Sequence, residues 1–373
     1  MKSNSLICTK TQTEYSLEAP IWQSEQGDLL DIRFKPSFDK KNIRNRPANL
    51  WRYREALPII SDENMVSFGE GATPLQKILI EGQEVHLKLD FLMPTGSYKD
   101  RGSALMISKA KELGIQKVVQ DSSGNAGSSV AAYCAKANIA CEIYVPAYVS
   151  ETKLLQIKSY GAKVVLVEGT REQTAQKAYE AAKDTYYASH VWNPFFFQGT
   201  KTIAFEIAEQ LAWSVPDTIV VPVGNGSLLI GLYIGFRELH KAGITDKSPK
   251  IIAVQAKNVS PLYQAFTEGL TYIPAIQAQE TIAEGVAIGF PLRGKQILQY
   301  VELTGGAFLS VEEQEIKSAW QMIAQKGYFV EPTSAVALAG LRQYLQNNDT
   351  GEKIALVLTG TGLKASTKIA SLL

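Results

Sequence analysis

Residues 218–239, TIVVPVGNGSLLIGLYIGFREL, hold the pattern that decides the fold. A short β-branched run is followed by a loop of small residues and then by an apolar segment with helical spacing. The first nineteen of these residues, 218–236, would match a membrane span in length, but a proline, two glycines and an asparagine at 222–226 interrupt them. We therefore interpret the stretch as a strand, a loop and a buried helix.

The same alternation of strand and helix runs along most of the chain. Apolar, β-branched runs predict buried strands. They lie at Lys117–Gln120, Glu142–Val145, Lys163–Val167, Ile219–Val223, Ile251–Val254 and Ile354–Leu358. Segments with apolar residues at helical spacing predict helices at Ser103–Leu113, Gly127–Ala137, Arg171–Asp184, Lys201–Ala212 and Val311–Lys326. This order predicts an α/β fold with parallel-rich sheets and helices on both faces, which binds ligands at the carboxyl ends of its strands.

The size and composition of the chain limit its class. A chain of 373 residues exceeds the usual size of one core, so two domains are expected. The first fifty residues lack the alternation, and residues 39–47 (DKKNIRNRP) suggest a linker. Because 38 basic residues balance 37 acidic ones, nucleic acid is not an expected partner. The opening residues carry no secretory h-region, which predicts a cytoplasmic protein without a membrane anchor.

The residues that bind metals in proteins are few and scattered. Three cysteines, Cys8, Cys134 and Cys141, lack a CxxC spacing, and three histidines lie far apart. A catalytic metal is therefore not expected.

Three segments carry groups that suit a phosphorylated ligand. Residues 223–227 (VGNGS) place small residues at a helix start, where amides bind phosphate, although a tight turn would explain them as well. Residues 121–129 (DSSGNAGSS) offer hydroxyls and an amide, although a helix cap would also use them. Lys99, in PTGSYKDRG of residues 94–102, would by itself be an ordinary solvated lysine. Together the three segments indicate a phosphorylated cofactor.

Four motifs, in this order, resemble those of fold-type II pyridoxal phosphate enzymes, the tryptophan synthase β-like group. They are SYKDRG at 97–102, SSGNAGSS at 122–129, PVGNGS at 222–227 and TGTGLK at 359–364. Within the group the chain is most similar to threonine synthase, and the likeness spans residues 50–365. The segments that carry this closer likeness are LWRYR at 50–54, GEGATPL at 69–75, GTKT at 199–202 and EPTSA at 331–335.

The resemblance implies roles for named residues. Lys99 would hold pyridoxal 5'-phosphate as an internal aldimine and would later move protons of the substrate. Thr359 would meet the ring nitrogen with a hydroxyl, which cannot protonate it, and a neutral ring favours elimination and replacement. The remaining predicted contacts are Asn125 at the phenolic oxygen, Gly224, Asn225, Gly226, Ser227 and Leu228 at the cofactor phosphate, and Ser122, Ser123, Gly124 and Ala126 at the substrate.

The resemblance also implies a domain plan. A large domain, residues 51–103 and 200–373, would bind the cofactor, and a small α/β domain, residues 104–199, would be inserted in it. The site would lie between these domains. Residues 1–50, with Cys8 and GDLLDI at 27–32, resemble a zinc-ribbon lead that has lost its other cysteines. A homodimer is implied by the family alone.

Several positions depart from the threonine synthase pattern. Four positions at which that family commonly has polar contacts to phosphate carry apolar residues in this chain. They are Ala126, Val191, Phe196 and Leu228. Two activities therefore stay open. One is a carbon–oxygen lyase that converts O-phospho-L-homoserine and water to L-threonine and phosphate. The other is β-elimination or β-replacement on serine, threonine or a small activated amino acid. The run Phe195–Phe197 could equally be core packing.

Two further readings are weaker. A non-enzymatic binding module would leave the lysine, the cofactor loop and the ring-nitrogen hydroxyl unexplained. A nucleotide-binding dehydrogenase would need a GxGxxG after a strand, which the sequence lacks.

Overall fold

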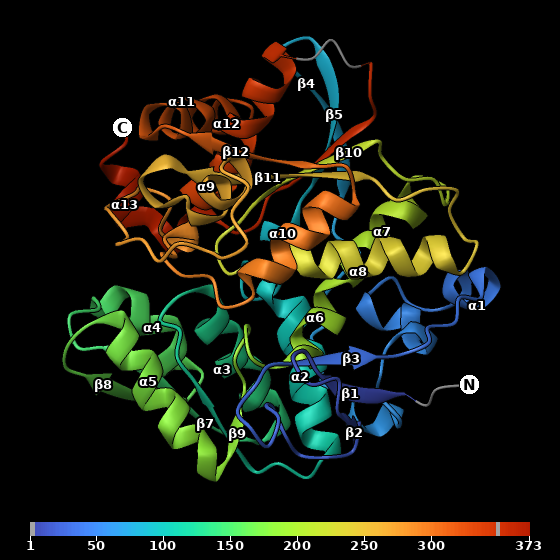
Figure 1. Ribbon diagram of the computed structural model, residues 1–373, viewed down its shortest axis with the longest axis vertical. Coiled ribbons are helices and arrows are strands. Elements are labelled where there is room, and N and C mark those ends of the chain that lie inside the picture. The colour runs from blue at the N-terminus through green and yellow to red at the C-terminus, as the bar shows by residue number, and fades with distance from the viewer. Residues whose placement is uncertain (1–3, 348–350) are drawn as a thin grey trace. The chain divides into compact units, whose positions relative to one another are not determined.

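The computed structural model describes residues 4–347 and 351–373 (Figure 1). The chain divides into two compact units. Unit 1 comprises the described residues up to Gly71 together with Lys99–Thr202, and unit 2 comprises Ala72–Tyr98 and Ile203–Leu373. The chain therefore passes from one unit to the other three times, and one of these passages is the peptide bond between Tyr98 and Lys99.

Unit 2 is built on a six-stranded sheet with the order β12-β11-β10-β13-β5-β4. The hairpin β4–β5 is antiparallel and every other pair is parallel. The strands are β4 (Leu75–Ile80), β5 (Gln83–Lys88), β10 (Thr218–Pro222), β11 (Lys250–Ala256), β12 (Ala307–Val311) and β13 (Ile354–Val357). The helices are α7 (Thr202–Gln210), α8 (Ser227–Lys241), α9 (Pro261–Thr267), α10 (Gly294–Leu303), α11 (Glu313–Gln325), α12 (Pro332–Asn347) and α13 (Ser366–Ala370). Short 3-10 turns are η3 (Asp90–Leu92), η5 (Lys257–Val259), η6 (Glu284–Val286) and η7 (Gly362–Ala365).

The centre of the unit 2 sheet is buried on both faces. All five residues of β10 and all four of β13 are buried, as the apolar runs of central parallel strands require. Helix α12 packs directly against β11, because a Cβ on Gly340 would lie 2.4 Å from Cγ2 of Val254.

Unit 1 contains two sheets. The first has the order β8-β7-β6-β9 and is parallel throughout, and the second, β2-β1-β3, is antiparallel. The strands are β1 (Ser5–Cys8), β2 (Glu14–Ser16), β3 (Leu30–Arg33), β6 (Lys117–Gln120), β7 (Ala140–Pro146), β8 (Lys163–Val167) and β9 (Tyr186–Tyr187). The helices are α1 (Lys40–Asn45), α2 (Lys99–Glu112), α3 (Asn125–Ala137), α4 (Glu151–Ser159), α5 (Arg171–Ala181) and α6 (Pro194–Thr200), and the 3-10 turns are η1 (Leu50–Ala56), η2 (Asp62–Asn64) and η4 (Ala182–Asp184).

The predicted α/β fold class is confirmed. Each of the six predicted strands overlaps an observed strand, and the stretch 218–239 folds as β10, a loop and α8. The stretch 39–47, interpreted as a linker, contains a short helix, and its role as a linker stays a prediction. Asp39 caps a short helix there, α1, because its side chain accepts hydrogen bonds from the amides of Lys41 and Asn42.

The amino-terminal segment packs onto the rest of unit 1 through Trp22. This indole makes edge contacts with Tyr179, Tyr187 and Trp192 at ring-centroid distances of 5.3, 5.1 and 5.6 Å. Its Nε1 donates to the carbonyl of Ala182 at 3.2 Å. These contacts help to hold residues 4–71 in one unit with residues 99–202. The predicted domain boundaries at residues 50, 103 and 199 remain a prediction, since compact units do not test them.

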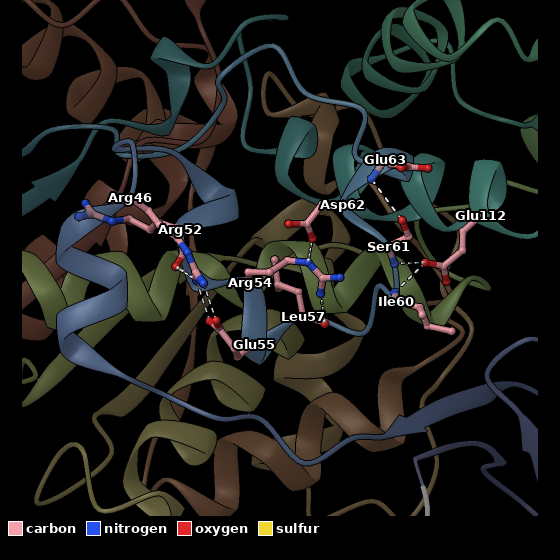
Figure 2. Close-up of polar contacts among 10 residues, drawn as sticks. All are labelled: Arg46, Arg52, Arg54, Glu55, Leu57, Ile60, Ser61, Asp62, Glu63 and Glu112. Atoms are coloured by element: carbon pink, nitrogen blue, oxygen red, sulfur yellow. Dashed lines mark hydrogen bonds and ion pairs between the residues drawn. The ribbon is translucent and has the colours of Figure 1, made fainter.

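Figure 2 shows polar contacts within residues 46–63 and two contacts from this segment to helix α2. Arg46 Nη1 donates to Glu55 Oε2 at 2.6 Å. Glu112, the last residue of α2, accepts from the amides of Ile60 at 2.7 Å and Ser61 at 3.3 Å. The carboxyl end of the helix that begins at Lys99 is thereby held in place.

Two broader features bear on function. Within 4–347 and 351–373, no helix combines the length and the apolar character that a bilayer span requires. Over the same residues, no three His, Cys, Asp or Glu side chains gather as a metal site would need.

Candidate functional site

The predicted site residues fall into two groups by unit. Unit 1 holds Lys99, Ser122, Ser123, Gly124, Asn125, Ala126, Val191 and Phe196, and unit 2 holds Gly224, Asn225, Gly226, Ser227, Leu228 and Thr359.

In unit 2 the loop between β10 and α8 favours glycine strongly at Gly226 and is tightly packed at Gly224. Gly226 is the N-cap of α8 and has φ of +76°, and a Cβ there would lie 2.3 Å from Cδ1 of Ile297. A Cβ on Gly224 would lie 3.0 Å from Cα of Val286. The chain therefore reaches the start of α8 by a path that side chains would obstruct.

The start of α8 has the features of an anion site. The amide of Ile230 makes an early intrahelical bond, to the carbonyl of Gly226 at 2.9 Å. The amides of the residues before Ile230 belong to the first turn of the helix and carry the positive end of its dipole. Ser227 and Leu228 are each only 2% exposed, so little water competes there. A phosphate is the ligand that such a helix start commonly binds.

Tyr98 joins two of the predicted cofactor contacts inside unit 2. Its hydroxyl lies 3.0 Å from Oγ of Ser227, and its amide donates to the carbonyl of Thr359 at 2.9 Å. Lys99 is the next residue in the chain. Sequence reasoning gave Tyr98 no role, and its place beside the lysine was the only available signal.

Thr359 lies in a compact buried network. Its Oγ1 donates to Oε1 of Glu331 at 3.0 Å and lies 2.9 Å from Oγ of Ser334. Its amide donates to the same Ser334 oxygen at 2.8 Å. The sequence motif EPTSA contains both partners, but sequence reasoning assigned neither of them a role.

In unit 1 Lys99 is the first residue of α2 and lies beside an aromatic ring. Its Nζ is 5.8 Å from the ring centroid of Phe196. That ring packs on Gly102, where a Cβ would lie only 2.4 Å from ring carbons. Phe195, Phe196 and Phe197 are all buried, so Phe196 both fills the core and lies next to the lysine.

The polar loop before α3 is ordered by its own hydrogen bonds. Oγ of Ser122 accepts from the amide of Gly124 at 3.3 Å. A Cβ on Gly127 would lie 1.8 Å from the Ser122 carbonyl oxygen, so only glycine fits there. Further along α3, Oγ of Ser129 donates to Oδ1 of Asp100 at 2.6 Å. This bond connects α3 to the residue that follows the lysine.

His190 is a buried titratable group near these residues. Its ring centroid lies 6.1 Å from that of Phe196. Burial lowers the pKa of His190 well below its usual 6.5, and the positive charges of Lys99 and Arg171 lower it further. The imidazole is therefore neutral at physiological pH.

Comparison with known proteins gives a consistent result. The model of the family described as pyridoxal-phosphate dependent enzyme matches residues 66–360. The threonine synthase of Methanocaldococcus jannaschii is 36% identical over 96% of this chain and 92% of its own length. That of Methanosarcina acetivorans is 35% identical over the same shares. Among solved structures, a fungal L-serine ammonia-lyase from Rhizomucor miehei superposes with a TM-score of 0.69 at 21% identity, covering 81% of this chain and 98% of its own, which is a likeness of fold.

Proposed function

Because the chain belongs to the family of pyridoxal-phosphate dependent enzymes, we propose that it acts as a threonine synthase. It would convert O-phospho-L-homoserine and water to L-threonine and phosphate. The observation that carries this proposal is the match to the threonine synthase of Methanocaldococcus jannaschii along nearly the whole of both chains. The cofactor is pyridoxal phosphate.

The described residues fit this cofactor. The buried start of α8, with a left-handed glycine at 226 and a tightly packed one at 224, suits a phosphate monoester. We assign Gly224, Asn225, Gly226, Ser227 and Leu228 to the cofactor phosphate, Asn125 to the phenolic oxygen and Thr359 to the ring nitrogen. Lys99 would hold the cofactor covalently through its ε-amine.

Residue roles in the reaction follow from this assignment. Bound pyridoxal phosphate supplies an electron sink for the substrate's α-carbon. The Lys99 amine would move protons at the α-carbon and beyond, while Ser122, Ser123 and Gly124 orient the substrate carboxylate. Formation of threonine breaks the bond between the γ-carbon and the phosphate oxygen. The γ-carbon takes up a proton in place of one that the β-carbon loses, the hydroxyl of water adds at the β-carbon, and the remaining proton of water goes to the phosphate. On this assignment the enzyme is a carbon–oxygen lyase.

The test is an assay of both products from one substrate. Purified protein loaded with pyridoxal phosphate should release threonine and phosphate in equal amounts from O-phospho-L-homoserine. Lys99→Ala should abolish turnover and the covalent adduct that borohydride traps. Lys111→Ala is the matched control, because Lys111 lies on the same helix and donates to the exposed Glu63 carbonyl at 2.9 Å. An inactive wild-type protein would reject the proposal.

A second activity is favoured by one observation, the buried Phe196 ring 5.8 Å from Nζ of Lys99. With Ala126 and Val191 also buried, these positions offer no charge-assisted hydrogen bond to a substrate phosphate, a contact worth about 1.5–3 kcal/mol. We propose as the alternative a β-elimination or β-replacement on serine, threonine or a small activated amino acid. Keto acid and ammonia from serine or threonine, without turnover of phosphohomoserine, would decide for it.

We also propose that the enzyme is a cytoplasmic homodimer whose partner is a small amino-acid substrate. Light scattering on the eluting protein tests the oligomeric state, and a monomer mass would reject the dimer.

A further inference from the structure

We propose that Tyr98 is a positioning residue whose hydroxyl donates a hydrogen bond to Ser227 and so directs the Ser227 hydroxyl toward the phosphate group of the cofactor. The inference rests on the proposed function, because it takes Ser227 to be a contact of that phosphate. Both residues belong to unit 2, and Oγ of Ser227 lies 3.0 Å from the Tyr98 hydroxyl. Tyr98 would therefore act on the cofactor through Ser227.

The backbone just before Tyr98 pairs with the segment that follows β13. The amide of Tyr98 donates to the carbonyl of Thr359 at 2.9 Å. The amide of Thr361 donates to the carbonyl of Gly96, also at 2.9 Å, which completes a short antiparallel bridge. A tyrosine side chain turns about only two torsions, so this fixed backbone leaves the Tyr98 hydroxyl few positions to occupy.

Close packing holds this bridge together. Gly96 has φ of +84°, and a Cβ there would lie 2.7 Å from Cγ2 of Thr361. Nζ of Lys364 also donates to the carbonyl of Thr95 at 2.9 Å. The segment that ends at Tyr98 is thus anchored by side-chain as well as backbone contacts, and the phenol extends from this anchor to the start of α8.

The other end of the contact is fixed by the helix. Ser227 is the first residue of α8 and is 2% exposed. Its hydroxyl has one proton and two lone pairs, whereas the oxygens of a phosphate dianion can only accept hydrogen bonds. Once the serine proton goes to the phosphate, the serine oxygen can only accept from Tyr98. The tyrosine is then the donor, and its proton keeps the serine proton turned away from the phenol.

This arrangement predicts a contribution that depends on the phosphate group of the ligand. Pyridoxal carries a neutral hydroxyl in place of that group. A neutral hydroxyl gains less from the Ser227 proton than an anion does, because charge-assisted hydrogen bonds are about twice as strong as neutral ones. Loss of the Tyr98 hydroxyl should therefore weaken binding of pyridoxal 5'-phosphate more than binding of pyridoxal.

The test compares the affinities of the cofactor-free protein for pyridoxal 5'-phosphate and for pyridoxal, both measured by absorbance titration. Tyr98→Phe keeps the aromatic ring and removes one oxygen atom. Its affinity for pyridoxal 5'-phosphate should fall about 2- to 12-fold, the range for loss of one neutral hydrogen bond, while its affinity for pyridoxal stays close to the wild-type value. Tyr344→Phe is the matched control in the same unit, because the Tyr344 hydroxyl donates to Glu352 at 3.0 Å instead, and it should keep both affinities.

A double-variant cycle separates this contact from a general effect of Tyr98 on folding. Ser227→Ala removes the hydroxyl through which Tyr98 acts, so adding Tyr98→Phe to it should cause no further loss of affinity for pyridoxal 5'-phosphate. Equal losses for the two ligands in Tyr98→Phe, no loss for either, or additive losses in the double variant would overturn the inference and leave the proposed function standing. Absence of any adduct at Lys99 in the wild-type protein would overturn the proposed function as well.

Discussion

Several glycines of the candidate site lie where a methyl group would be crowded or would overlap a neighbour. Gly224 and Gly226 shape the start of α8, and Gly360 admits the Glu331 carboxylate. At Gly226 both the backbone angle and the space exclude a side chain. The chemistry proposed for this chain thus depends on residues that contribute no functional group of their own.

Gly226→Ala should weaken cofactor binding. The left-handed conformation costs about 1–2 kcal/mol for an alanine, and the overlap with Ile297 adds to it. If the whole of this cost falls on the bound state, affinity drops about 5- to 30-fold. Absorbance titration with pyridoxal phosphate measures the change.

The control for that variant is Gly243→Ala. Gly243 also has positive φ, +68°, but a Cβ there would have nothing within 4 Å. It should lose stability and keep wild-type cofactor affinity. Equal affinities in the two variants would contradict the role given to Gly226.

The buried His190 should make stability fall in mild acid. Its pKa in the folded protein is well below the usual 6.5, so the unfolded chain takes up the proton first. Stability is full above pH 6.5 and is lost as the pH falls below it, by at most about 1.4 kcal/mol per pH unit for one group. Urea unfolding of the cofactor-free protein at several pH values measures this loss.

His190→Gln should flatten that dependence. Burial lowers the pKa of His86 as well, so a weaker loss should persist in the variant. An unchanged slope would show that His190 is not the group responsible.

At the scale of the element, helices α2 and α6 pack closely against each other because each has a glycine at the contact. Phe196 of α6 covers Gly102 of α2, and a Cβ on Gly199 would lie 2.0 Å from the carbonyl oxygen of Arg101. The helix that carries Lys99 is positioned by this contact.

Gly102→Ala should therefore destabilise unit 1 by about 1–3 kcal/mol, because the added methyl overlaps the Phe196 ring. The double variant Gly102→Ala with Phe196→Leu should be less destabilised than the sum of the two single variants. Chemical denaturation of the four proteins gives the coupling energy. Strict additivity would mean that the two residues do not share the space.

Elements with a strong periodic pattern were the ones that the sequence could predict. The strand Lys117–Gln120 is observed with the bounds that were predicted. The apolar run of β10 could likewise be identified as a strand from its own residues, without knowledge of what packs against it. Helix α6 (Pro194–Thr200) lacks such a pattern, because three phenylalanines and a glycine are poor helix formers that pack well on α2. The helix predicted from Val311 begins only at Glu313, since Val311 ends β12.

The site was predictable only as far as its motifs are local. Lys99 and the loop 224–227 stand in recognisable segments, and their roles stay predictions. The contact of Tyr98 with Ser227 joins residues 129 positions apart, and that of Glu331 with Thr359 joins residues 28 apart. No spacing rule reveals such pairs, because tertiary packing creates them.

At the scale of the whole molecule, the two units should respond separately to core damage. Trp22→Ala removes an indole that is 4% exposed and should cost about 3–5 kcal/mol, mainly in unit 1. Amides of β6 and β7 should exchange faster in hydrogen-exchange mass spectrometry, while those of β10 and β11 keep their rates.

Trp320→Ala, in the core of unit 2, is the reciprocal control. It should accelerate exchange in β10 and β11 and spare β6 and β7. Uniform acceleration in either variant would mean that the units unfold as one.

The position of β13 between β10 and β5 has a consequence for biosynthesis. This strand, Ile354–Val357, follows all the other strands of its sheet in the chain and leaves the ribosome after them. Until β13 has been made, the hairpin β4–β5 and the strands β10, β11 and β12 form two separate parts of the sheet. They are separate because β13 is the strand that pairs with both β5 and β10. Polypeptides that terminate prematurely would keep these open strand edges, which are the surfaces from which aggregates grow.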